Sequence, residues 1–387
     1  MIKLLFWISG GLIVYVYLGY PLLLWLLPAF FRVSLRTKSI EPSVSLLIAA
    51  YNEAAVIGAK IQNALTLDYP AQQLEIVVAS DGSTDATAQV VRSFAEGKAL
   101  GRLRLLEFPE NRGKVATLND AVPRLTSEIV AFSDASSMLA PDSLRHLVKY
   151  FADPLVGGVS GVYRVLKKDQ ARLGVQEDFY WKYETFLKVQ EAKLGGFTGA
   201  HGSLYAIRRE QYPFPAATTI NDDFIIPMRI RRRGYRIAYE PGAVAYEEAH
   251  EMEGFARRVR ITAGNIEQLR EVKSLLWTPQ PVSLFCLLSH KAGRLLVPLA
   301  MVLLAIASVM LWRDPVYRWF LWGQVLFYGL AALGALVTLR PGFLRLPYYF
   351  CMINSAFFAW IYHALRMGRM IPSRVELDQL GNPPSPR

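Results

Sequence analysis

The chain has 387 residues, of which 52% are hydrophobic and 19% are charged. An ordinary soluble domain carries about 25% charged residues, so this composition argues against a purely soluble protein and excludes a disordered one. The formal net charge of +11 suits nucleic acid, anionic lipid or a phosphorylated substrate as a partner. Two cysteines, Cys286 and Cys351, exclude a disulfide framework, and no Cys/His cluster has the spacing of a zinc site.

The N-terminal segment is apolar, with no charged side chain between Lys3 and Arg32. It is longer than the roughly 20 residues that a spanning helix needs, so we expect a transmembrane helix within residues 1–40. A cleaved signal peptide is the less favoured alternative, because the run exceeds the usual core of about 7–15 residues and no A-x-A site follows. Arg32, Arg36 and Lys38 come next, and by the positive-inside rule they place the following segment in the cytoplasm.

Three further uncharged runs lie near the C-terminus, at Leu295–Trp312, Trp319–Leu339 and Leu346–Leu365. Each is about long enough to span, so we expect about three transmembrane helices in residues 295–370, followed by a tail at 371–387. Residues 281–294 are apolar with basic residues at one end, which predicts an interfacial helix. If all three runs span, the arginines after the last one lie outside, against the charge rule; a re-entrant last run is the alternative.

Residues 41–280 remain as one cytoplasmic domain. Its first half alternates short apolar runs with helical patterns, and we expect strands at 44–50, 75–80, 103–107 and 128–132. Helical stretches extend to Leu67 after the first strand and through Phe94 after the second. This βαβα pattern predicts an α/β fold, with a mostly parallel sheet and helices on both faces.

Polar clusters follow three of these strands, at 51–53, 81–85 and 134–136. Ligands of such sheets bind beyond the carboxyl ends of the strands. We therefore predict functional roles for Asp81 and Asp134. The Ser-Thr-Asp run inside the second cluster is better explained by helix capping.

Seven motifs follow one another along the chain: AAYNEAAVI, VVASDGSTDAT, PENRGKVATLNDAV, IVAFSDASSML, GAHGSLYAIRR, INDDF and RRVRITAGN. Each is weak alone, but the ordered set resembles the membrane-bound family 2 glycosyltransferases with the GT-A fold. Within that family it is similar to the cellulose, hyaluronan and poly-N-acetylglucosamine synthase group. The resemblance covers residues from about 43 to at least 365. It implies a nucleotide-diphospho-sugar transferase domain and an inverting transfer from a UDP-sugar.

The resemblance also implies the residues that grip the donor. Those at the uracil and ribose are Ala50, Tyr51, Glu53 and Asp81. Lys114 reaches a phosphate or ribose, although a solvated lysine at a helix start explains it equally well.

Two arginines, Arg258 and Arg260, match those of the family's Q-R-x-R-W motif and would clamp the pyrophosphate. The Gln of that motif is replaced by Arg257 and the Trp by Ile261. Because that Trp contacts the acceptor in the family, its loss leaves acceptor type and processivity open. A basic surface patch near anionic lipid is the alternative for these arginines.

Asp134 matches the first acid of the family's D-x-D motif, which implies Mg²⁺ or Mn²⁺ shared with the donor diphosphate. Ser136 stands where the second acid usually stands, and its hydroxyl would bind the metal directly or through water. Asp223, in INDDF, matches the family's general base, with Asp222 beside it. An N-cap at Asn221 or Asp222 is compatible with that role.

The acceptor site is placed by the same resemblance at His201, Gly202, Ser203 and Trp181. Small residues there would let an acceptor sugar approach the backbone. A packed histidine and a helix that buries its own aromatic side chains are the alternatives for His201 and Trp181.

The favoured reading is an inverting glycosyltransferase of the inner or plasma membrane, with its catalytic domain in the cytoplasm. It would extend a glycan or glycolipid from a UDP-sugar, in contact with membrane lipid and with polysaccharide-export subunits as candidate partners. The alternatives are single addition to a polyprenyl-phosphate or other lipid acceptor, and a non-catalytic subunit that binds nucleotide or glycan. We discount nucleic acid, because no recognition module surrounds the arginine cluster at 229–236.

Overall fold

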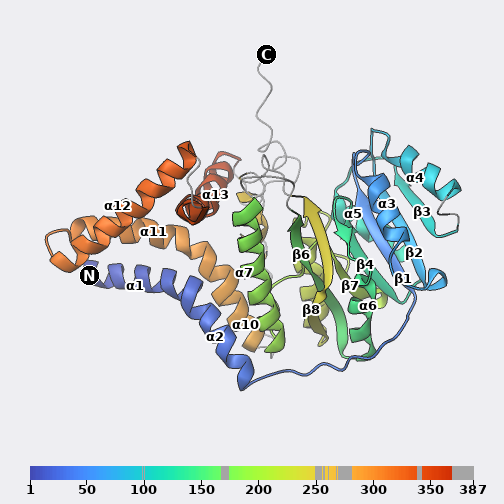
Figure 1. The fold of residues 1–387 in the computed structure, drawn as a ribbon, viewed down its shortest axis with the longest axis horizontal. Coiled ribbons are helices and arrows are strands. Elements are labelled where there is room, and N and C mark those ends of the chain that lie inside the picture. Colours follow the sequence, from blue (N-terminus) through green and yellow to red (C-terminus); the bar gives the residue numbers. More distant parts are fainter. Residues whose placement is uncertain are drawn as a thin grey trace, which may run out of the picture.

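The computed structural model describes residues 1–97, 99, 101–166, 174–248, 255, 258–259, 261–266, 268, 281–337 and 342–367. Figure 1 shows two parts, an α/β domain around one sheet and a group of long helices beside it. Helix α7 (Gly174–Lys193) stands between the sheet and the long helices.

The first four expected strands are confirmed, at β1 (Val44–Ala50), β2 (Leu74–Asp81), β3 (Leu103–Phe108) and β4 (Ile129–Asp134). They pair in parallel, with β1 between β2 and β4. The expected α/β fold with a mostly parallel core is therefore present.

The second half of the domain extends this sheet with β5 (Met138–Leu139), β6 (Val156–Leu166), β7 (Tyr205–Arg208) and β8 (Arg236–Glu248). Within the described residues the sheet has eight strands in the order β3-β2-β1-β4-β7-β6-β8-β5. Strand β7 runs antiparallel to both of its neighbours, whereas β6 and β8 are parallel to each other. The sheet is thus mixed beyond β4.

Helices cover both faces of the sheet. They are α3 (Ile57–Leu65), α4 (Thr87–Glu96), α5 (Lys114–Ala121), α6 (Ser143–Val148), α7 and α8 (Asp222–Arg232). Successive side chains of a strand point to opposite faces. In β1, Leu46 and Ile48 pack with α3, α4 and α6 in one core cluster, and Leu47 packs with α5 and α8 in another. Single 3₁₀ turns lie at Leu27–Ala29, Ala71–Gln73, Val122–Arg124, Lys149–Ala152, Arg209–Gln211 and Gly342–Arg345.

The long helices are α1 (Ile2–Val14) with α2 (Tyr20–Leu26), α10 (Pro281–Cys286) with α11 (Gly293–Met310), α12 (Pro315–Leu336) and α13 (Leu346–Met367). Short π-helical segments at Tyr15–Gly19 and Leu287–Ala292 join α1 to α2 and α10 to α11. Three described helices are long and apolar enough to cross a membrane: Ile2–Ala29, Pro281–Met310 and Pro315–Leu336. The expected N-terminal helix and the first two C-terminal runs fall among them.

The structure adds detail to two expectations for the C-terminal part. The segment 281–294 continues without a break into the next apolar run, and its place at the membrane interface stays a prediction. The last run forms α13 but is not among the helices apolar enough to span. Ala356 and Trp360 of α13 instead pack against Val259 and Ala263. The tail at 371–387 lies outside the described residues.

Candidate active site

The carboxyl ends of three parallel strands meet at one edge of the sheet. Ala50, the last residue of β1, pairs with Ser80, and Ala49 pairs with Asp134. Tyr51, Asp81 and Asp134 therefore emerge side by side, as the sequence predicts. Tyr51 is 45% exposed and Asp81 is 3% exposed, so the two contribute differently to this edge.

Hydrogen bonds join the loops after β1 and β2. The side-chain oxygen of Asn52 accepts a hydrogen bond of 2.8 Å from the backbone N–H of Thr84. The N–H of Glu53 donates to the Thr87 hydroxyl at 2.8 Å, and that of Ala54 donates to Asp85 at 3.1 Å. Asp85 also accepts from the N–H of Thr87 at 2.9 Å, although the N-cap residue of α4 is Ala86, which makes no side-chain capping hydrogen bond. The joined loops hold Tyr51 and Glu53 at the rim of the site.

Asp81 fixes the loop that precedes α5. Its two carboxylate oxygens accept hydrogen bonds from the N–H of Arg112 at 3.0 Å and of Gly113 at 2.8 Å. The next residue, Gly82, has φ +64°, and a Cβ there would lie 2.4 Å from the nitrogen of Asn111. Only glycine fits this close approach. A direct contact between Asp81 and a nucleotide remains a prediction.

Lys114 begins α5 and points into a group of acids. Its Nζ lies 2.8 Å from Oδ1 of Asp134 and 3.3 Å from Oδ1 of Asp222. Although burial opposes it, the attraction of these two carboxylates raises the pKa of Lys114 above its usual range. The alternative of a solvated lysine is therefore wrong.

Asp222 and Asp223 occupy the first turn of α8. The Tyr205 hydroxyl donates a hydrogen bond to Oδ2 of Asp222 at 3.1 Å, and the backbone oxygen of Asp223 accepts one from Ala200 at 2.9 Å. Asn221 is the N-cap residue, but its side chain makes no capping hydrogen bond. The start of α8 is therefore fixed by Tyr205 and by the backbone.

The acids converge at Gly202. A Cβ on Gly202 would lie 3.6 Å from Oδ2 of Asp134 and 3.6 Å from Oδ2 of Asp223. Burial, and then the nearby charge of Asp222, raise the pKa of Asp223 to about 6, against the opposing charges of Lys188, Lys114 and Lys291. A carboxylate with that pKa is a suitable proton acceptor near neutral pH.

The acids present fit a divalent cation that is shared with a substrate. Among the described residues, no group of three or more His, Cys, Asp or Glu forms a complete metal cage. Mg²⁺ and similar ions often take one or two protein carboxylates and fill their shell with water and phosphate oxygens. Asp134 supplies one carboxylate at the edge of the sheet. Ser136 donates to Oε1 of Glu247 at 2.6 Å, and its oxygen keeps lone pairs for a cation.

The segment predicted to bind the acceptor lies beside the start of α8. His201 is 4% exposed, and its ring centroid lies 5.6 Å from that of Trp181 and 5.7 Å from that of Tyr239. Burial, and then the charge of Lys188, hold the pKa of His201 well below its usual range, so the ring is neutral. In the part of the chain that the structure describes, its Nε2 has no hydrogen-bond partner, and neither have Ser203 Oγ and Trp181 Nε1. The ring faces of His201 pack against aromatic side chains, as the packed-histidine alternative expects. Its Nε2 atom is not accounted for by packing.

Arg258 is buried among aromatic side chains. Its guanidinium carbon lies 4.4 Å from the ring centroid of Tyr180 and 5.9 Å from that of Trp181. It also donates a hydrogen bond of 2.8 Å to the Tyr349 hydroxyl of α13. A surface patch is thus wrong for Arg258, and its role as a pyrophosphate clamp remains a prediction. Arg257 and Arg260 lie outside the described residues.

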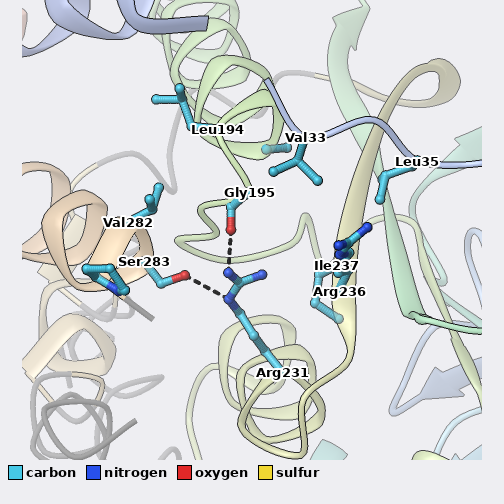
Figure 2. Close-up of a pocket in the computed structure, with 11 residues that line it drawn as sticks. Val33, Leu35, Leu194, Gly195, Arg231, Arg236, Ile237, Val282 and Ser283 are labelled. Atoms are coloured by element: carbon cyan, nitrogen blue, oxygen red, sulfur yellow. Dashed lines mark hydrogen bonds between the residues drawn. The ribbon is translucent and has the colours of Figure 1, made fainter. Parts of the chain in front are cut away.

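A separate cavity of about 230 Å³ lies away from these acids (Figure 2). Arg231 reaches into it, donating to Ser283 Oγ at 2.7 Å and to the backbone oxygen of Gly195. Arg231 follows Asp223 by eight residues on α8, which is about 12 Å at 1.5 Å per residue. These hydrogen bonds tie the end of α8 to the segment after α7 and to α10, so we assign this region to the joint between the two parts of the chain.

Comparison with known proteins agrees with this geometry. A family model described as "Glycosyltransferase like family 2" matches residues 42–265, more than half of the chain. The chain belongs to this family, and the resemblance noted from its motifs is confirmed. The fold class is confirmed as well.

Two curated relatives and one solved structure are informative. The chain is 27% identical over 232 residues to poly-beta-1,6-N-acetyl-D-glucosamine synthase of Staphylococcus aureus, and 26% identical over 248 residues to that of Staphylococcus epidermidis. These alignments take in 58% and 62% of this chain, and it spans 55% and 59% of the relatives' length. A mannosyltransferase from Pyrobaculum calidifontis, solved with GDP-Man and Mn²⁺, matches 92% of this chain and 99% of its own, at 26% identity and a TM-score of 0.68.

Several residues at the site were not predicted from the sequence to have a role there. Lys60 and Glu247 belong to no motif, and Tyr205 lies in the motif GAHGSLYAIRR without a predicted role. Only the fold brings these three residues to Ser133, Ser136 and Asp222. Lys188 and Lys291 read as ordinary basic residues of a helix and of an apolar run. A pattern in the sequence could have identified Lys188 and Lys291. Each is a lysine among apolar or aromatic residues of a helix, where burial of its charge is costly.

Proposed function

We propose that this chain transfers a sugar from a nucleoside-diphosphate donor to a hydroxyl of an acceptor, with inversion at the anomeric carbon. The observation that carries the proposal is the convergence of Asp134, Asp223 and Lys114 at the edge of the sheet. Membership of glycosyltransferase family 2 supports it.

In the proposed step, Asp223 accepts the proton of the acceptor hydroxyl. The hydroxyl oxygen forms a bond to the anomeric carbon, and the bond from that carbon to the diphosphate breaks. The nucleoside diphosphate leaves with the electron pair. A base in hydrogen-bond reach contributes about 10²–10⁴-fold to such a reaction.

The leaving diphosphate carries the largest charge in the reaction. Lys114 is already held by two acids, so its ammonium is in place for a phosphate oxygen without a further loss of side-chain freedom. Asp134, with Ser136 beside it, would hold Mg²⁺ or Mn²⁺, and that ion would neutralise charge on the leaving group. The Mn²⁺ in the Pyrobaculum structure supports a divalent metal here.

The donor is a UDP-sugar or a GDP-sugar. The motifs favour UDP, whereas the Pyrobaculum mannosyltransferase was solved with GDP-Man. Tyr51, Glu53, Asp81 and Ala50 surround the place proposed for the nucleoside. Basic residues after the N-terminal helix support a cytoplasmic position for this site, where nucleotide sugars are found.

The acceptor is a growing polysaccharide or a glycolipid. Similarity to the staphylococcal synthases favours a polysaccharide. The second candidate is single addition to a lipid-linked acceptor. It is favoured by Ile261, which stands where the family's acceptor-contacting Trp is expected.

The test uses the full chain in nanodiscs with Mg²⁺ or Mn²⁺ and a panel of UDP-sugars and GDP-sugars. Nucleotide release and product size are recorded together. Release with one donor and a ladder of long products establishes a polysaccharide synthase. Release with a single-addition product establishes the second candidate. Nucleotide binding without release, even after addition of membrane extract, would overturn the proposal in favour of a binding subunit.

A further inference from the structure

A buried group of acidic and basic side chains joins α7 to the helix Pro281–Met310, which is apolar enough to cross a membrane. His290 of that helix lies between two glutamates of α7. Its Nδ1 is 2.6 Å from Oε1 of Glu191, and its Nε2 is 3.1 Å from Oε1 of Glu184. Nη1 of Arg294 lies 2.6 Å from the other oxygen of Glu184. The histidine and both glutamates are at most 4% exposed.

Both nitrogens of the His290 ring carry a hydrogen in this arrangement. An ionised carboxylate only accepts hydrogen bonds, so a ring nitrogen that faces one has to donate. Burial opposes the ionisation of Glu184, but the charges of Arg294 and His290 hold its pKa well below its usual range. Buried charges are normally paired. Here the two glutamates are balanced by one guanidinium and one imidazolium.

Two π-helical segments, one from each of two long helices, meet at this group. The Tyr15 hydroxyl of the first segment lies 2.7 Å from Oγ of Ser289 in the second. Tyr20, directly after the first segment, donates a hydrogen bond of 2.7 Å to Oε1 of Glu191. His290 belongs to the second segment. Because π-helical segments are rare and frequently occur at functional sites, we searched this group for a connection to the proposed site.

A path of contacts leads from His290 to the proposed base. Oε1 of Glu191 faces the histidine ring, and its Oε2 accepts a hydrogen bond from the Thr198 hydroxyl. Two residues after Thr198, the N–H of Ala200 donates to the backbone oxygen of Asp223 at 2.9 Å. The residues proposed to bind the acceptor follow directly. The position of His290 is thus transmitted to the acceptor segment, residues 199–203, and to the start of α8.

We propose that His290 is a positioning residue for the transfer. As an imidazolium between two glutamates it holds Thr198, and Thr198 holds the acceptor segment against the backbone of Asp223. This inference rests on the proposed function, which assigns the acceptor and the base to these elements. His290 acts through them and not on the reacting atoms. Its loss is therefore expected to lower the rate of transfer without weakening the binding of nucleotide.

Two amide variants separate the two contacts of the ring. The side-chain nitrogen of Asn lies at the δ position, as Nδ1 does, and that of Gln lies at the ε position, as Nε2 does. His290→Asn therefore retains a donor toward Glu191, on the path to Asp223. His290→Gln retains a donor only toward Glu184. Positioning requires the Asn variant to outperform the Gln variant, whereas an ion pair that only joins the helices predicts an equal loss in both.

The acceptor segment is first observed without substrate. Amide hydrogen exchange is followed by mass spectrometry on the full chain in nanodiscs, in peptides that cover residues 196–203. His290→Gln and Thr198→Val are expected to speed exchange there about 10-fold, the effect of losing one hydrogen bond to a charged group. His290→Asn and Thr198→Ser are expected to retain the original rate. Unchanged exchange in the Gln and Val variants, or equal acceleration in Asn and Gln, would overturn the proposal.

Transfer is then measured with the UDP-sugar or GDP-sugar that releases nucleotide, and with membrane extract as the source of acceptor. We expect kcat to fall about 10- to 100-fold in His290→Gln and Thr198→Val, since a displacement of about 1 Å can cost 10²-fold. Affinity for UDP or GDP should not change. Values of kcat that follow the thermal midpoints of the variants, and not their exchange rates, would show a purely structural role.

His146→Gln is the matched control, because His146 of α6 also lies between two acids. Its Nε2 is 3.2 Å from Asp142 and its Nδ1 is 3.9 Å from Glu240. We expect this variant to leave both kcat and the exchange of residues 196–203 unchanged. A loss equal to that of His290→Gln would refute a specific role for His290.

The exchange measurement separates failure of this inference from failure of the proposed function. A chain that shows the expected order of exchange but never releases nucleotide would retain the path from His290 to Asp223 and refute the transferase. A chain that transfers sugar equally fast in all four variants of His290 and Thr198 would retain the transferase and refute the positioning role.

Discussion

The ammonium of Lys114 lies 2.8 Å from Oδ1 of Asp134, which joins the start of α5 to the loop after β4. The same ammonium lies 3.3 Å from Asp222 at the start of α8. Three elements that are far apart in the sequence are thus held together by one charge. In the proposed reaction, the donor diphosphate would meet a cation whose position is already fixed by these acids.

Lys114→Met tests whether that cation acts on the leaving group. The substitution keeps much of the side-chain volume and removes the charge. We expect kcat to fall about 10²–10³-fold, the usual effect of losing one preorganised donor at a site of developing charge. Nucleotide release measured against donor concentration checks this. Lys38→Met, at an exposed lysine, is the control, and an equal loss in both variants would contradict the assignment.

Asp223→Asn removes the proposed base while preserving shape. We expect transfer to fall about 10²–10⁴-fold, with nucleotide affinity nearly unchanged. Turnover and equilibrium binding of UDP or GDP, measured on the same preparation, separate the two effects. Asp142→Asn, at a carboxylate that is 57% exposed, is expected to leave both unchanged. Full activity of Asp223→Asn would show that another group accepts the proton.

The pH dependence of transfer follows from the pKa of Asp223. Burial and Asp222 raise that pKa to about 6, and Lys114, Lys188 and Lys291 oppose the rise. Since only the ionised carboxylate accepts a proton, kcat/KM is expected to fall below about pH 6 and to level off above it.

The variant Lys188→Met tests whether nearby positive charge lowers the pKa of Asp223. Removing the positive charge in Lys188→Met takes away an opposing effect, so the acidic limb is expected to move to higher pH. Lys182→Met is expected to leave the limb in place. A shift to lower pH in Lys188→Met would contradict this electrostatic account of Asp223.

Gly82 tests the packing that positions the site. A methyl group at Gly82 would meet the backbone of Glu110 and Asn111 at 2.4 Å, at φ +64°. Gly101 has φ +76° but open space around it. Gly101→Ala therefore reports the conformational cost alone, about 1–2 kcal/mol. Gly82→Ala is expected to reduce the free energy of unfolding by clearly more, and so to lower the midpoint of thermal unfolding further than Gly101→Ala does. Equal midpoints in the two variants would show that the loop at residues 110–111 moves to accommodate the methyl group.

The parallel half of the sheet is predictable from sequence, because each buried strand is a short apolar run that ends in a polar cluster. The acids Asp134 and Asp223 are predictable for a different reason, since they stand in motifs of an ordered set. The antiparallel β7 has no such pattern: Tyr205–Arg208 is short and its register depends on β4 and β6. The boundary expected between residues 294 and 295 is absent, since Pro281–Met310 is one helix. Basic side chains inside an apolar helix look like an end of it.

The contacts around Asp134 show why the rest of the site was not predictable. Ser133, Ser136 and Ser137 look alike in the sequence. In the fold, Ser133 accepts from Lys60, Ser136 donates to Glu247, and the backbone oxygen of Ser137 accepts from Lys60. These partners come from α3 and β8, at separations that no local pattern encodes.

Lys60 holds the end of β4 and the loop that follows it, residues 133–137, through two hydrogen bonds. It is fully buried, and its Nζ donates to Ser133 Oγ at 2.7 Å and to the backbone oxygen of Ser137. Burial lowers the pKa of Lys60 to about 7, against the opposing charges of Asp134 and Glu247. Ser133 also donates to the backbone oxygen of Ser203 at 2.8 Å. Lys60 thus positions the loop of Asp134 and Ser136, which is proposed to bind metal. Through Ser133 it also positions the segment that contains Ser203, which is proposed to bind the acceptor.

Lys60→Met is expected to weaken metal-dependent activity about 10- to 100-fold, as loss of a residue that orients a metal ligand does. The metal concentration for half-maximal activity should rise, while kcat at saturating metal falls less. A purely structural role would lower kcat and leave the metal dependence unchanged. Lys149→Met, which removes a partly exposed ion pair with Glu240, is the control for loss of a lysine from the same domain. Titration of Mn²⁺ into both variants, with nucleotide release as the readout, decides between positioning and bulk packing.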